Sequence, residues 1–142
     1  MASPATRQVL FRRPSETVHG ALMLGAIVNG TVDVLLEPGA WYVTLFIDAN
    51  ATSAGTITAA PLALDGTTVL IEDAPYVIGQ AGSVAASLTL TDQVGQYQLA
   101  QLATGANAGF PIVVAGGIRF TIAAIAGASA TNKLEYVAAR VS

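Results

Sequence analysis

Three short turn sequences punctuate the first half of this chain. They are Asn29-Gly30, Glu37-Pro38-Gly39 and Asp65-Gly66, and apolar residues alternate with other residues on either side of each. Asn-Gly and Asp-Gly suit a two-residue hairpin because they tolerate the positive φ angles that this turn requires. Pro-Gly favours other tight turns. The spacing therefore predicts antiparallel β-hairpins rather than helices.

Pairing residues outward from the first turn gives a predicted register for residues 21–28 and 31–36. One face of that hairpin is apolar, because the register sets Ile27 opposite Val32, Gly25 opposite Val34 and Met23 opposite Leu36. The same rule applied to the third turn stacks four apolar residues on one face, namely Leu62, Leu64, Val69 and Ile71. Both patterns predict strands with one buried side.

Alternation continues to the end of the chain. Further strands are predicted at residues 40–48, 83–90, 118–126 and 133–141. Residues 91–104 fit both helical and strand spacing, and we favour a strand over residues 96–103. About eight short antiparallel strands with regular turns indicate an all-β fold, a β-sandwich or jelly roll. We expect an extended N-terminal arm over residues 1–20 and one β domain over residues 21–142.

Residues 40–48 do not show the pattern of a strand that has one buried face and one face exposed to solvent. Trp41, Val43, Leu45 and Ile47 define one side, and the other side is also largely apolar. Such a strand is either central in a sandwich or has its second face in a subunit interface. Only 11% of the residues are charged, against about 25% in ordinary soluble domains. We therefore predict that Tyr42, Thr44 and Phe46 lie in an interface between copies of the chain.

The first thirteen residues concentrate half of the basic side chains of the protein. Three adjacent apolar residues lie among them, which is unusual for a purely disordered tail. We interpret this segment as an arm that binds a partner surface, and its candidate binding residues are Arg7, Val9, Leu10, Phe11, Arg12 and Arg13. A frayed terminus is the alternative interpretation.

Catalysis, cofactors and metals find little support in the residue types present. The chain has no cysteine and a single histidine, His19, so a triad or a metal cluster would have to be built around that imidazole. Ser15 and Glu16 lie near it, but no nucleophile-elbow motif occurs. Glu72-Asp73 lacks the alternating acids of a calcium loop. We expect no enzyme activity, cofactor or metal.

Nucleic acid and membranes are not expected partners either. The net charge is −3, whereas a nucleic-acid groove is basic. The longest apolar stretches, residues 21–28, 40–47 and 118–126, fall far short of the roughly 20 residues that span a bilayer.

The arm, the charge-poor β domain and the segments 116–122 (GGIRFTI) and 134–137 (LEYV) resemble small virion proteins of bacteriophages, above all capsid decoration (cement) proteins. The resemblance implies a subunit of a homo-oligomer, expected to be a trimer, that clamps neighbouring capsomers. The implied partner is the major capsid protein, and the implied location is the capsid exterior of a virion assembled in the host cytoplasm.

Two other functions remain open on the sequence alone. A receptor- or carbohydrate-binding module of a phage fibre or tail would use exposed aromatic residues and the loops at residues 48–55 and 104–111. Trp41, Tyr42 and Phe46 are candidates for sugar stacking, although a core role for Trp41 is the preferred interpretation. A capsid shell or tail-tube subunit is the third alternative.

Overall fold

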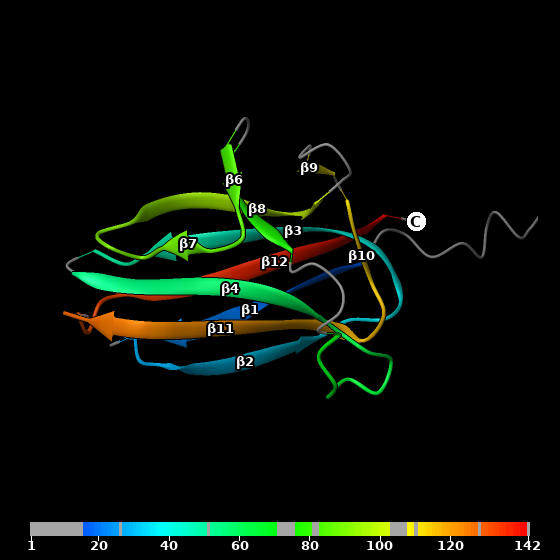
Figure 1. The fold of residues 1–142 in the computed structure, drawn as a ribbon, viewed down its shortest axis with the longest axis horizontal. Helices are drawn as coiled ribbons and strands as arrows, with labels where there is room; N and C mark the ends of the chain where they lie inside the picture. Colours follow the sequence, from blue (N-terminus) through cyan, green and yellow to red (C-terminus); the bar gives the residue numbers. More distant parts are fainter. Residues whose placement is uncertain are drawn as a thin grey trace, which may run out of the picture.

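The structure, a computed structural model, describes residues 16–25, 27–50, 52–70, 76–80, 83–102, 108–109, 111–127 and 129–141. Within these residues the chain forms twelve β-strands in two antiparallel sheets (Figure 1). The sheets pack face to face as a sandwich. The all-β sandwich expected from the alternation of apolar residues is confirmed.

The larger sheet has eight strands and the smaller sheet has four. In the larger sheet the order is β1 (Thr17–Leu24), β12 (Lys133–Val141), β3 (Gly39–Asp48), β8 (Val94–Leu102), β5 (Val77–Gln80) and β6 (Ser83–Ala85). Two short strands extend it, β10 (Ile112–Val114) beside β3 and β9 (Ala108–Gly109) beside β8. The smaller sheet has the order β2 (Gly30–Leu35), β11 (Gly117–Ala126), β4 (Ala54–Leu62) and β7 (Leu88–Thr89).

The chain changes sheet at most of its connections. It passes from β1 to β2, from β2 to β3 and from β3 to β4, each time changing sheet, and it does so again from β7 to β8 and from β11 to β12. The strand orders β1-β12-β3-β8 and β2-β11-β4-β7 are those of an eight-stranded jelly roll. The other four strands lie on the connections between β4 and β7 and between β8 and β11.

Two of the predicted hairpins are wrong for this reason. The turns at Asn29-Gly30 and Glu37-Pro38-Gly39 join strands of different sheets. Val32 therefore pairs with Phe120 and Val34 with Ile118, rather than with Ile27 and Gly25. Turn chemistry reverses the chain but does not choose the partner strand. The predicted alternation in β2 is correct, since Val34 is 5% exposed and its neighbour Leu35 is 65% exposed.

The third predicted turn keeps its register. Leu62 pairs with Val69, as expected from Asp65-Gly66. The Asp65 carboxylate accepts hydrogen bonds from the backbone N–H groups of Thr67 and Thr68, at 2.8 and 2.9 Å, and from the Thr68 hydroxyl at 2.6 Å. The predicted stacking of Leu64 on Leu62 is wrong, because Leu64 is 74% exposed while Leu62 is fully buried. Ile71, the fourth predicted member, lies outside the described residues.

Several strand boundaries differ from the predicted ones. Strand β1 begins at Thr17, inside the range assigned to the arm, and ends at Leu24. Its exposed outward residues made this edge strand look like a polar terminus. Residues 83–90 split at a bend into β6 and β7, which belong to different sheets. The strand favoured at residues 96–103 is confirmed as β8.

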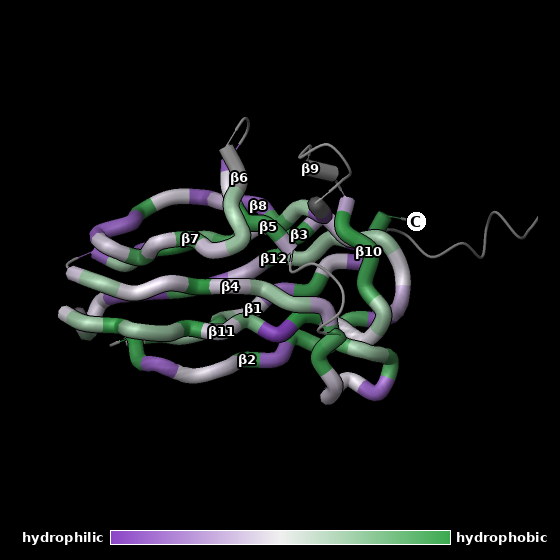
Figure 2. Tube along the Cα trace, in the orientation of Figure 1, coloured by the Kyte–Doolittle hydropathy of each residue, from purple (hydrophilic) through white to green (hydrophobic). Residues whose placement is uncertain are grey.

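Inward-pointing side chains of both sheets form one core. Apolar residues recur along the strands of both sheets (Figure 2). The largest fully buried side chains are Trp41, Phe120, Ile27, Leu45, Ile57, Leu62, Ile78, Leu90, Leu99, Ile112, Ile118 and Ile122. Trp41 also satisfies its indole N–H by donating to the carbonyl oxygen of Glu37 at 2.9 Å. The interpretation of Trp41 as a core residue is confirmed.

Replacing Gly117 by alanine should destabilise the sandwich by at least about 2 kcal/mol, since both strain and overlap contribute. Gly117 has a φ of 135°, and a Cβ there would overlap the carbonyl oxygen of Val34 in the neighbouring strand. Gly30→Ala is the matched control, because a Cβ on Gly30 meets nothing within 4 Å. Urea unfolding measures both free energies. Equal stabilities of the two variants would contradict this account of Gly117.

Asp65→Ala should lower the thermal midpoint at pH 7. The hydrogen bond from the Thr68 hydroxyl, followed by those from the backbone of Thr68 and Thr67, lowers the pKa of Asp65 from 3.8 to about 2. A carboxylate whose pKa is lower in the folded state stabilises that state at pH values above its unfolded-state pKa. This contribution is lost as the pH falls toward the folded-state pKa. The deficit of the variant relative to the wild type should therefore shrink between pH 4 and pH 2. A deficit that is constant over this range would show that the charge is not responsible.

Candidate subunit interface on the larger sheet

The outer face of the larger sheet carries the three residues that the sequence assigned to a subunit interface. Tyr42, Thr44 and Phe46 alternate along β3 with the buried residues Trp41, Val43 and Leu45. Tyr42 is 48% exposed and Phe46 is 39% exposed. Thr44 lies between them and is partly buried. The structure therefore places all three on one solvent-facing side of a central strand.

Neighbouring strands extend this face in register. Across β12 and β1, Tyr42 lies in a row with Ala139 and Thr17, and Phe46 lies in a row with Glu135 and Ala21. On the other side of β3, Thr44 pairs with Gln98 and Phe46 with Gln96 of β8. We call this surface the outer A face, defined by Tyr42, Thr44, Phe46, His19, Ala21, Glu135, Val137, Ala139, Gln96 and Gln98.

A depression of about 320 Å³ lies within the outer A face. Phe46, His19, Glu135 and Val137 are among the residues that line it. An aromatic residue, a histidine and a glutamate around one depression can receive a side chain of a partner. Sequence reasoning missed this depression because its residues come from β1, β3 and β12, which are adjacent only in the folded sheet.

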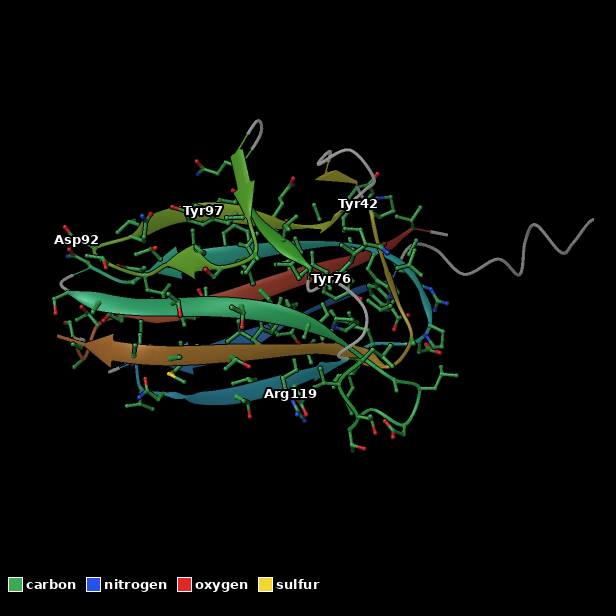
Figure 3. All side chains as sticks on the ribbon, in the orientation of Figure 1. Tyr42, Tyr76, Asp92, Tyr97 and Arg119 are labelled. Atoms are coloured by element: carbon green, nitrogen blue, oxygen red, sulfur yellow. The ribbon has the colours of Figure 1, made fainter. Side chains whose placement is uncertain are left out.

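The outer face of the smaller sheet is different in character. Thr31, Thr121 and Thr58 lie in one row across β2, β11 and β4. In the next row lies Arg119, which Figure 3 labels. It binds Asp33 through two hydrogen bonds, of 2.7 and 2.9 Å. The hydrogen bond from Arg119 lowers the pKa of Asp33 and keeps it ionised. These hydroxyl and charged side chains are well suited to contact with water, whereas the exposed aromatic rings of the outer A face are not.

Arg140 organises the end of the sandwich where β1 begins. Its guanidinium donates to the carbonyl oxygen of Pro38 at 2.7 Å and lies 5.7 Å from the centre of the Trp41 ring. It also lies 3.7 Å from the carboxylates of both Glu16 and Glu37. The backbone N–H of Arg140 donates to the Glu16 carbonyl at 2.7 Å. The residue preceding β1 is thereby fixed to the body of the domain.

The other sequence candidates are placed apart or lie outside the described residues. His19 faces outward on β1, while the Glu16 carboxylate is beside Arg140. Trp41 is in the core and cannot join Tyr42 and Phe46 in a stacking platform. Outside the described residues lie Ser15, Glu72, Asp73 and the arm residues Arg7, Val9, Leu10, Phe11, Arg12 and Arg13.

Among the residues that the structure describes, no group of three or more histidine, aspartate or glutamate side chains is arranged to hold a metal ion. The described part of the chain contains no helix of the length and apolarity needed to cross a membrane.

Comparison with known proteins finds no relative of this chain. No family model, no curated protein and no solved structure matches the chain.

Proposed function

We propose that this protein is a structural virion subunit that decorates and stabilises a bacteriophage capsid. It assembles as a homo-oligomer, a trimer in the form implied by the sequence resemblance, and binds the major capsid protein on the capsid exterior. The observation that carries the proposal is the outer A face, where Tyr42 and Phe46 are exposed on a central strand. Aromatic residues are enriched in subunit interfaces.

Composition supports burial of this face in an assembly. A chain in which 11% of residues are charged and 53% are hydrophobic has little polar surface with which to stay monomeric. The polar Thr and Arg119–Asp33 rows are on the smaller sheet, so the two outer faces are suited to different surroundings. In the proposed assembly the outer A face packs against other subunits and the threonine face stays hydrated.

The jelly-roll strand order adds support at the level of the fold. Jelly rolls occur in viral capsid proteins and also in lectin domains. One fold serves many functions, so this analogy supports a virion role at the level of the fold and assigns no residues to it.

A receptor- or carbohydrate-binding module is the second candidate. The depression lined by Phe46, His19 and Glu135 favours it, because an exposed aromatic ring can stack on a sugar and a neighbouring carboxylate can accept hydrogen bonds from the sugar hydroxyls. Binding to a glycan array, together with a position at the tail tip in electron micrographs, would support this alternative against decoration. Labelling over the head would exclude it. The third candidate, a shell or tail-tube subunit, would be labelled throughout the shell or tube.

Phe46→Asp and Tyr42→Asp should each weaken self-association on the order of thirtyfold, the effect of losing an aromatic anchor worth about 2 kcal/mol. Both side chains are exposed, so the fold should persist. Val28→Asp is the matched control, because Val28 is 57% exposed and lies between β1 and β2, away from the outer A face. Sedimentation velocity measures association. A wild-type monomer, or a Phe46→Asp variant that associates normally, would contradict the proposed interface.

Capsids that carry the protein should break at a higher temperature than capsids that lack it, because each added interface must be separated before the shell opens. Adding the purified wild-type protein back to bare capsids should restore the higher temperature, and Phe46→Asp should restore less of it. Calorimetry of both particles measures the difference. Equal breaking temperatures with and without the protein would contradict a stabilising role.

A further inference from the structure

A second apolar surface lies at the end of the sandwich, away from the outer A face. Leu35 at the end of β2, Pro38 in the following turn and Leu64 in the loop after β4 surround a notch of about 370 Å³. Leu35 is 65% exposed and Leu64 is 74% exposed. We call this surface the end notch. Two large apolar side chains at its rim are left to water in the isolated chain.

The rim of the end notch is acidic. Glu37 and Asp65 line it, and Glu16 lies close by, because the Arg140 guanidinium is 3.7 Å from the carboxylates of both Glu16 and Glu37. Asp65 accepts its hydrogen bonds from uncharged groups of Thr67 and Thr68, and these bonds keep its pKa low. The three carboxylates outnumber the Arg140 guanidinium. The Arg119 guanidinium reaches the Thr67 carbonyl oxygen beside Asp65 but is already paired with Asp33, so the surroundings of the apolar notch favour a cationic ligand.

The N-terminal segment of the chain has the complementary composition. Val9, Leu10 and Phe11 form an apolar run, and Arg7, Arg12 and Arg13 flank it. An apolar centre between cations matches an apolar notch with an acidic rim. The segment also joins the domain at the same end of the molecule as the notch. Glu16 is bonded to Arg140, and Arg140 binds Glu37 and Pro38 of the turn beside the notch.

The geometry of this attachment favours the notch of another copy. The six residue-to-residue steps from Leu10 to Glu16 span about 20 Å when extended. Pro14 disfavours helical backbone at Arg13, so we expect an extended course there, and a segment that continues the line of β1 outward from Glu16 would have to reverse to reach the notch of its own chain. The backbone of Glu16 is already bonded to Arg140. A neighbouring copy within this reach presents its notch without that reversal.

We infer that residues 7–13 of one copy bind in the end notch of a neighbouring copy, with the apolar run on Leu35 and Leu64 and the arginines at the acidic rim. This inference rests on the proposed function, since it requires that copies assemble. It assigns the arm a partner site on the protein itself rather than on the capsid.

Disulfide trapping in the full-length chain tests the contact, and the absence of native cysteine makes the reporters unique. A tagged Leu10→Cys chain is mixed with an untagged Leu64→Cys chain under mild oxidation. The matched control replaces the second partner by Thr89→Cys, which is exposed on β7 beside Thr56, toward the other end of β4. A bound arm should raise the rate of mixed-disulfide formation at the notch at least about tenfold over the control, through its high effective concentration.

Charge reversal gives a second readout. Glu37→Lys should reduce the Leu10–Leu64 trapping rate several-fold, and combining it with Arg12→Glu and Arg13→Glu in the partner chain should restore the rate. Circular dichroism and the fluorescence of the buried Trp41 confirm that each variant is folded.

The outcomes separate this inference from the proposed function. Fast mixed-disulfide formation with rescue by the charge swap supports the exchange of arms between copies. Equal trapping at Leu64 and Thr89, or rapid closure of a disulfide within a single Leu10→Cys/Leu64→Cys chain, overturns it. Sedimentation of the wild type as an oligomer in either of those cases leaves the outer A face interface standing, whereas a monomer overturns assembly itself.

Discussion

Burial of one sheet against the other is the constraint on which this structure depends. The inner side of β3, with Trp41 and Leu45, and the inner side of β11, with Ile118 and Phe120, are fully or almost fully buried. Each such side chain gains about 1.5–3 kcal/mol by leaving water. Because most connections change sheet, most successive strands lie in opposite layers and contribute their apolar sides to the same core. Glycine at position 117 lets the chain enter β11 where a side chain would strike Val34.

The local pattern of the fold could be predicted, but the pairing of strands could not. Alternation of apolar residues locates β3, β8, β11 and β12 closely, since which side of a strand is buried is a property of adjacent residues. The turn at Asp65 was placed in register because its hydrogen bonds are made within four residues. Val32, by contrast, pairs with Phe120, and the free energy that selects such a distant partner comes from the whole core rather than from the turn beside it.

The same distinction, between local patterns and the pairing of distant strands, applies to the candidate site. The sequence identified Tyr42, Thr44 and Phe46 because both sides of β3 are apolar, and the structure shows these residues on the outward side. It could not identify the depression beside Phe46, which needs β1, β12 and β3 to be neighbours. No pattern in the sequence pointed to Arg140 either. Its place opposite Trp41 follows from the register of β12 on β3, and that register is set by the packing of the sheet.

The separation of the two apolar surfaces bears on the symmetry of the proposed assembly. A surface that binds its own copy around a twofold axis closes a dimer, whereas a trimeric ring needs two different surfaces that bind each other on successive subunits. The outer A face lies across the strands, and the end notch lies where β2 and β4 end. The arm leaves the domain beside that notch, at Glu16. Arm and notch are two different surfaces of one chain, so contact between them on successive copies can close a ring, and the outer A face then packs against a neighbouring subunit of the same assembly.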